Sequence, residues 1–168
     1  VDRYGYPLNS TYIDNSKEKL SYYFKQAPNT MRLIREAAHP YISPIDKLRV
    51  EFDEVWPYGS NVGVIDGKKT FCGIGRIMSA KLSHLSEEPP HFDSVPQHYL
   101  PEICKQFADN IYLNVPDYGG ELEIWDVEPI DVDNSNNFIV PKNWRAVLPQ
   151  SIKVKPEQGD LILFNTRR

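Results

Sequence analysis

The chain has 168 residues, of which 40% are hydrophobic, 12% aromatic and 25% charged, and its formal net charge is −4. This composition is typical of a folded chain with a sizeable core, and it argues against disorder. The acidic balance offers no basic face to a nucleic-acid backbone, and no apolar run approaches the roughly 20 residues that span a bilayer, so we predict neither nucleic-acid nor membrane partners.

The first part of the chain, to about residue 57, carries helical patterns. Ser16 is a candidate N-cap of a first helix, which Pro28 should end. A second, short helix is predicted from about Thr30 to Ala38, because its apolar residues recur at helical spacing and His39-Pro40 follows as a stop.

A third helix is predicted to begin at Ser43-Pro44. This pair has the form of an N-cap followed by proline at the first helical position. One face of the helix is apolar and should pack on a sheet. The residues of that face are Ile45, Leu48, Phe52, Val55 and Trp56.

After Pro57 the pattern changes to alternating apolar and polar residues. Val62 and Val64, the Asp66-Gly67 turn and residues 70–78 predict a hairpin, in which Gly73 and Gly75 mark a bulge or a close backbone approach. Further strands are expected over 110–115, 122–124, 152–154 and 161–164, with turns at 116–120 and 156–159.

We find no internal repeat or linker, and therefore expect a single domain over residues 1–168. Its class should be mainly β with N-terminal helices: about residues 1–57 are helical, and about 58–168 form a mostly antiparallel sandwich or barrel.

The two cysteines, Cys72 and Cys104, lie too far apart for a zinc knuckle or a C-x-x-C redox motif. Two thiols in a chain of this length do not make a disulfide framework. The segment from Val1 to Tyr4 also lacks a secretion-signal pattern. We therefore expect a protein of the reducing cytoplasm.

The segment Pro89-Pro90-His91-Phe92-Asp93 places an imidazole and a carboxylate two residues apart. On an extended backbone such side chains point to the same face, so His91 and Asp93 can converge on one ion. They would supply two of the three ligands of the facial triad that holds Fe(II) in oxygenases. Alone, an H-x-D pattern is short enough to recur by chance.

Three later segments give this motif a context: Ile111-Tyr112-Leu113-Asn114, Gly119-Gly120-Glu121-Leu122, and the stretch from Lys155 to Phe164. Their order after His91 and Asp93 resembles the Fe(II)- and 2-oxoglutarate-dependent oxygenases of the prolyl-4-hydroxylase type. The resemblance covers about residues 70–168. It implies a double-stranded β-helix (jelly roll) with the N-terminal helices packed on one sheet.

The resemblance also implies roles for particular residues. His91 and Asp93 would be iron ligands, Tyr112 would hydrogen-bond the distal carboxylate of 2-oxoglutarate, and Asn114 would line the same pocket. No catalytic residue beyond the metal ligands is implied. Without the resemblance, Tyr112 is better interpreted as a half-buried aromatic residue of a sheet.

The chain departs from the family pattern at its end. In the family, the second iron-binding His and a basic anchor of 2-oxoglutarate follow a strand like 161–164, and here neither is present before Arg168. The only other imidazoles are His39, His84 and His98, and none matches the expected place. We expect the third ligand beyond Arg168, and the sequence to be a fragment. A chain that naturally ended at Arg168 would favour a non-catalytic jelly-roll binding module.

The resemblance implies Fe(II) and 2-oxoglutarate as cofactors, O2 as co-substrate and ascorbate as a possible reductant. Asp93 favours hydroxylation, desaturation or ring formation over halogenation, since related halogenases replace this carboxylate with a small residue. We expect a small-molecule substrate, such as an amino acid or a natural-product intermediate. Prolyl residues of a protein are the second choice, and the oligomeric state is not indicated.

Two further features have competing interpretations. Arg76, just before the motif, can pair bidentately with a substrate carboxylate, or it can form a surface ion pair. Asp131-x-Asp133 resembles the metal-nucleotide motif of some glycosyltransferases, but it lies in an Asn-rich segment without a nucleotide-binding framework. A solvated acidic loop or a weak Ca²⁺ site explains it better.

Overall fold

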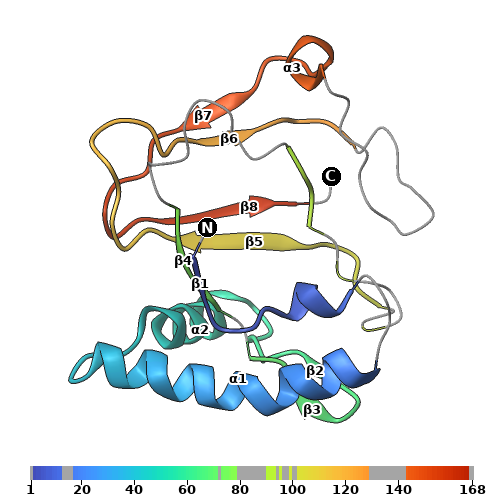
Figure 1. The fold of residues 1–168 in the computed structure, drawn as a ribbon, viewed down its shortest axis with the longest axis vertical. Helices are drawn as coiled ribbons and strands as arrows, with labels where there is room; N and C mark the ends of the chain where they lie inside the picture. The colour runs from blue at the N-terminus through green and yellow to red at the C-terminus, as the bar shows by residue number, and fades with distance from the viewer. Residues whose placement is uncertain are drawn as a thin grey trace. The chain divides into compact units, whose positions relative to one another are not determined.

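The structure, a computed structural model, describes residues 2–12, 17–71, 73–78, 90–93, 95, 99, 102–128 and 143–166 (Figure 1). The chain divides into two compact units, residues 1–86 (unit 1) and residues 87–168 (unit 2), which we describe separately. The single domain expected from the sequence stays a prediction. No helix in the described ranges is long and apolar enough to cross a membrane.

Unit 1 is dominated by α1, which spans Lys17–Ala38 as one continuous helix (Figure 1). The prediction that Pro28 ends a first helix and that a second begins at Thr30 was therefore wrong. A proline inside a helix removes one hydrogen bond and costs about 3 kcal/mol. Here Pro28 is exposed, while Ala27 and Met31 on either side of it are buried, so one apolar stripe runs past the proline and packing outweighs the local cost. The expected stop at His39-Pro40 is confirmed.

The core of unit 1 lies under α1. Tyr23 is only 1% exposed, and its hydroxyl donates a hydrogen bond of 2.5 Å to the carbonyl oxygen of Phe71. A buried tyrosine needs such a partner for its polar end. The hydrophobic residues buried in unit 1 are Leu20, Tyr23, Ala27, Met31, Leu48 and Ile65.

The second helix, α2, spans Pro44–Val55 and begins as predicted. Ser43 is its N-cap: the Ser43 hydroxyl accepts a hydrogen bond from the backbone N–H of Asp46. Of the predicted apolar face only Leu48 is buried, while Val55 is 68% exposed and Trp56, just past the helix end, is 57% exposed. The predicted face is therefore buried only in part.

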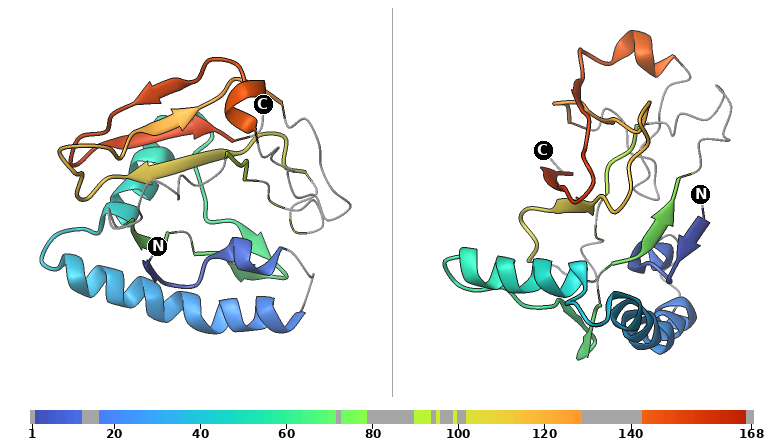
Figure 2. Two further views of the ribbon diagram at one scale, coloured as in Figure 1. Left: turned by 45° about the horizontal axis from the view of Figure 1, so that its top comes forward. Right: turned by 90° about the vertical axis from the view of Figure 1, so that its left-hand side faces the viewer.

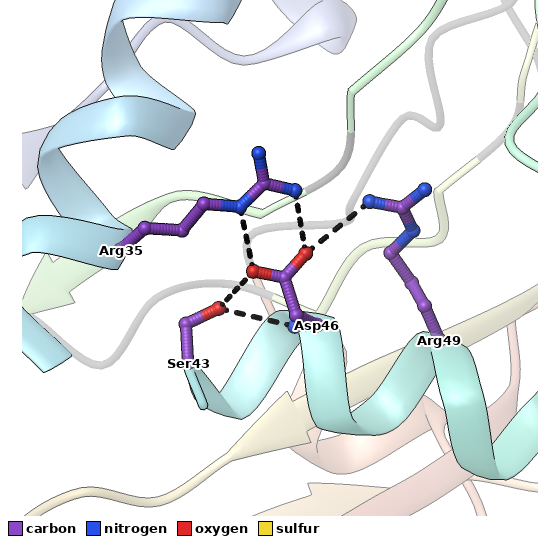
Figure 3. Close-up of polar contacts among 4 residues, drawn as sticks. All are labelled: Arg35, Ser43, Asp46 and Arg49. Atoms are coloured by element: carbon purple, nitrogen blue, oxygen red, sulfur yellow. Dashed lines mark hydrogen bonds and ion pairs between the residues drawn. The ribbon is translucent and has the colours of Figure 1, made fainter. Parts of the chain in front are cut away.

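The Asp46 carboxylate ties the start of α2 to α1 (Figure 3). Arg35 of α1 donates two hydrogen bonds of 2.7 Å to its two oxygens, Ser43 donates one of 2.7 Å, and Arg49 lies 3.4 Å away. The bidentate bond from Arg35 is the largest cause that lowers the pKa of Asp46, from its ordinary 3.8 to about 2. We call these four residues the Asp46 clamp.

The short strands of unit 1 form two antiparallel pairs. β2 (Val64–Ile65) pairs with β3 (Lys68–Lys69) through Asp66 and Gly67, whose φ angles of 50° and 73° are those of a primed hairpin turn. The predicted turn is therefore confirmed, but the second strand of the hairpin lies at 68–69 and not within the predicted 70–78. β4 (Gly75–Ile77) pairs instead with β1 (Asp2–Tyr4), a strand that the sequence did not predict. A short 3-10 helix, η1, spans Leu8–Thr11.

The expectation of a close backbone approach at Gly73 is confirmed. A Cβ atom at this position would lie 2.1 Å from Cδ1 of Ile45 on α2, and the φ angle of Gly73 is 101°. The backbone conformation therefore favours glycine, and any larger residue would also have to displace the Ile45 side chain.

Unit 2 is built from two antiparallel strand pairs (Figures 1 and 2). β5 (Phe107–Ile111) pairs with β8 (Leu161–Asn165), and β6 (Leu122–Ile124) pairs with β7 (Ile152–Val154). Along the sequence, β6 and β7 thus both lie between β5 and β8. A single-turn helix, α3 (Trp144–Val147), lies before β7 and was not predicted.

The predicted strands of unit 2 match these elements closely at 122–124, 152–154 and 161–164. The strand expected over 110–115 begins earlier, at Phe107, and its regular part ends at Ile111. The described parts of the chain thus combine helices with small antiparallel sheets, none of which closes into a barrel. The mixed composition agrees with the expected fold class in its coarse form.

Candidate functional site

His91 and Asp93, the two candidate metal ligands, both lie in unit 2 and are exposed, while Phe92 between them is half-buried. This alternation is what an extended segment produces when two side chains share one face and the third points away. An imidazole and a carboxylate that are reachable from solvent are suitable donors for Fe(II).

No third ligand lies beside them in the part of the chain that the structure describes. Among the described residues, no group of three or more His, Cys, Asp or Glu side chains could hold a metal ion. His84 and His98 lie outside the described residues, as do Asp131 and Asp133. The metal site expected at His91 and Asp93 therefore stays a prediction.

Tyr112, the candidate 2-oxoglutarate ligand, directly follows β5 and is half-buried. Its backbone N–H donates to the carbonyl oxygen of Asp160 at 2.9 Å, and its own carbonyl oxygen accepts from the N–H of Gly159 at 2.7 Å. These two bonds extend the β5–β8 ladder by one residue. They also join two motif segments that are far apart in the sequence.

The register of the β5–β8 pair shows which residues share a face with Tyr112. Asn110 lies opposite Ile162, and Ala108 opposite Phe164. By the two-residue period Ala108, Asn110 and Tyr112 point to one side, which we call the Tyr112 face. Its apolar members are half-buried, whereas Phe107, Leu161 and Leu163 on the opposite face are 50%, 46% and 47% exposed.

Asn114, the second residue expected near 2-oxoglutarate, is exposed and lies beyond the end of β5. It belongs to the segment that leads into the turn at 116–120 and makes none of the β5–β8 ladder bonds. Its role stays a prediction.

The turn between Asn114 and β6 was predicted from its glycines, and the structure confirms it. Gly119 and Gly120 have φ angles of 75° and 78°, which favour glycine. Lys155, just after β7, donates from Nζ to the carbonyl oxygen of Pro116 at 2.8 Å and also to that of Gly119. Sequence reasoning missed this lysine's contact, because its partners are backbone atoms 39 and 36 positions away.

Sequence reasoning also missed a polar cluster around Glu123 of β6. Ser151 donates a hydrogen bond of 2.5 Å to Glu123, and Arg145 and Lys153 lie 3.6 and 3.7 Å from its carboxylate. The Ser151 bond, followed by the two cations, lowers the pKa of Glu123. Trp125 and Trp144 meet edge to face at 5.5 Å. Together these contacts attach α3 to the β6–β7 pair.

The pKa of a carboxyl on β5, that of Asp109, is shifted in the direction opposite to that of Glu123. Asp109 lies on the face of β5 away from Tyr112, and desolvation by surrounding protein atoms raises its pKa. The residue as a whole still has an exposed surface. Its charge therefore disfavours the folded state slightly.

Arg76, the candidate substrate ligand, lies on β4 in unit 1 and is exposed. It is directly opposite Arg3 of β1 in the strand register. No carboxylate within the described ranges contacts it, so the ion pair that was its alternative interpretation is not seen there.

Comparisons of the chain with protein-family models, with curated proteins and with solved structures found no match.

Proposed function

We propose that the chain belongs to an Fe(II)- and 2-oxoglutarate-dependent oxygenase. The observation that carries the proposal is the backbone bonding of Tyr112 to Gly159 and Asp160. The family resemblance rests on separate segments, and this contact places two of them side by side. Lys155, at the start of the segment 155–164, likewise contacts Gly119 in the segment 119–122.

The pairing order of unit 2 supports the jelly roll that this function requires. A jelly roll forms when a chain folds back on itself and its antiparallel pairs wind around a common core. Here β6–β7 is nested within β5–β8 along the chain. Such nesting is the pattern of a doubled-back chain, and it would continue outward with strands that flank these two pairs.

In the proposed site, His91 and Asp93 hold Fe(II) together with a third ligand that we expect in the polypeptide beyond Arg168. When bound, the metal and 2-oxoglutarate supply the oxidising chemistry that acts on an unactivated C–H bond of the substrate. The neighbouring Phe92 is half-buried.

The role of Tyr112 in the proposal is to orient 2-oxoglutarate. Its phenol donates a hydrogen bond to the distal carboxylate, and hydrogen bonds to a charged group are about twice as strong as neutral ones. Because both backbone groups of Tyr112 are bonded to β8's leading turn, its side chain starts from a fixed point on the Tyr112 face. Asn114 is proposed to line the same pocket.

The reaction we propose is hydroxylation, desaturation or cyclisation of a small molecule, such as an amino acid or a natural-product intermediate, in the cytoplasm. Ascorbate would serve as reductant. Asp93 retains the carboxylate that distinguishes these outcomes from halogenation in the family that the chain resembles.

The proposal is tested by anaerobic titration of the protein, with its natural C-terminal extent, with Fe(II) and then 2-oxoglutarate. A weak visible charge-transfer band should appear on addition of 2-oxoglutarate. The Tyr112→Phe variant should require about tenfold more 2-oxoglutarate, because one charge-assisted hydrogen bond is lost. Absence of the band in the wild-type protein would sink the oxygenase and favour a binding module.

A further inference from the structure

The pairing of β1 with β4 puts two arginines directly opposite each other. The register aligns Arg3 with Arg76, and both residues are exposed. Directly opposite side chains of an antiparallel pair project from the same face, with Cβ atoms about 4.5–5.5 Å apart. Like charges at such positions are unfavourable to the sheet. The side-chain pair Arg3–Arg76 therefore does not contribute to the stability of the two strands.

Every other described arginine has an acidic partner. Arg35 and Arg49 share Asp46, Arg32 contacts Glu36, and Arg145 contacts Glu123. By contrast, neither Arg3 nor Arg76 makes a hydrogen bond or ion pair with a described residue. The nearest acid in β1, Asp2, points to the other face by the two-residue period of the strand.

Two guanidinium groups that project from opposite positions of one strand pair, without a contact to a described carboxylate, have the chemistry of an oxyanion receptor. A guanidinium presents a planar fork of donors that matches a carboxylate or a phosphate bidentately, as Arg35 does with Asp46. A ligand oxyanion between Arg3 and Arg76 would also remove the repulsion between them.

We propose that Arg3 and Arg76 form a binding site for an oxyanion group, a carboxylate or a phosphate, of a small molecule. The inference is independent of the oxygenase proposal, because it depends only on the β1–β4 pair. The sequence had already indicated Arg76 as a candidate partner of a substrate carboxylate. The structure adds Arg3 beside it, and the ligand is expected to be an anion.

The site is tested by NMR titration of the arginine Nε–Hε signals with N-acetylglycine and, separately, with inorganic phosphate at constant ionic strength. The Arg3 and Arg76 signals should shift together and saturate. Arg3→Gln and Arg76→Gln should each lower the affinity about tenfold, since each removes a charge-assisted contact. The matched control is Arg32→Gln, which removes an exposed arginine of α1 and should leave the affinity unchanged.

The amide signals of Tyr4 and Gly75 report whether β1 and β4 remain paired in each variant. Should a glutamine variant lose the pairing, Arg3→Lys and Arg76→Lys decide, because they keep the charge but lose the fork and should still weaken binding severalfold. The anion that saturates at the lower concentration identifies the ligand group. Shifts that do not saturate with either anion, or an equal loss in Arg32→Gln, would overturn the proposal.

Discussion

Units 1 and 2 are stabilised in different ways. Apart from Tyr99 and Pro156, the buried apolar residues of the described chain belong to unit 1, where they line α1, α2 and the β2–β3 hairpin. Unit 2 is instead organised by backbone ladders, glycine turns and contacts of side chains with backbone carbonyls. The proposed metal and 2-oxoglutarate residues all lie in unit 2. The comparison indicates that packing specifies unit 1 and that hydrogen-bond geometry specifies the segments around the candidate site.

The largest expected effect is in the core of unit 1. Tyr23→Ala should lower the free energy of unfolding by about 3–5 kcal/mol, because it leaves a cavity and an unpaired Phe71 carbonyl. Tyr22→Ala is the matched control: Tyr22 is 51% exposed and should cost less than about 1 kcal/mol. Urea unfolding measures both. Equal costs for the two variants would mean that α1 does not bury this face.

The next largest effect is expected at the Gly119-Gly120 turn of unit 2. Gly120→Ala should destabilise by about 1–2 kcal/mol, because alanine is strained at a φ angle of 78° and its Cβ would lie 3.1 Å from Pro116. Gly119→Ala is strained alike, at 75°, but meets no atom within 4 Å and should cost less. Urea unfolding of the two variants compares them. The reverse order would contradict the described turn.

The Asp46 clamp provides a pH-dependent prediction for unit 1. In the folded protein the pKa of Asp46 is about 2, below its ordinary value of 3.8, so the ionised form of this carboxyl favours folding. The stabilisation is fully present above pH 3.8 and is lost as the pH falls through about 2. Asp46→Asn should cost about 1 kcal/mol at pH 7, a value reduced by solvent screening. Unfolding measured at pH 7 and at pH 2 should show a much smaller difference between variant and wild type in acid.

The smallest expected effect has the opposite sign and belongs to unit 2. Because desolvation raises the pKa of Asp109, its charge opposes folding above the folded pKa, and this penalty disappears as the pH falls below the ordinary value of 3.8. Asp109→Asn should therefore stabilise at pH 7 by less than about 0.5 kcal/mol, given its exposed surface. Thermal unfolding at pH 7 measures the shift, and a clear loss of stability would show that the carboxylate has a favourable partner.

The parts of the fold that the sequence predicted are those fixed by local chemistry. Ser43-Pro44 begins α2, Asp66-Gly67 turns the β2–β3 hairpin, and Gly119-Gly120 turns the chain before β6. In each case neighbouring residues satisfy the backbone or relieve its strain. The apolar strand β8 was likewise visible in its own residues.

The features that the sequence did not predict depend on distant partners. Pro28 is retained inside α1 because the stripe on the opposite side is buried, and β1 is a strand only because β4 lies beside it. Of the candidate site, the structure gives the exposure of His91 and Asp93 and the backbone bonds of Tyr112, while their roles stay predictions. Lys155 and the Arg3–Arg76 pair could be found only from strand register and contacts across the chain.

The central claim, that His91 and Asp93 bind Fe(II), is tested most directly by equilibrium dialysis of Fe(II) under nitrogen with the protein at its natural C-terminal extent. We expect one bound iron per chain in the wild type. His91→Ala and Asp93→Ala should each lower the affinity for Fe(II) at least about tenfold, since each removes a ligand. The matched control His39→Ala removes an exposed imidazole of unit 1 and should bind as the wild type does. Iron binding that is unchanged in both ligand variants would contradict the account.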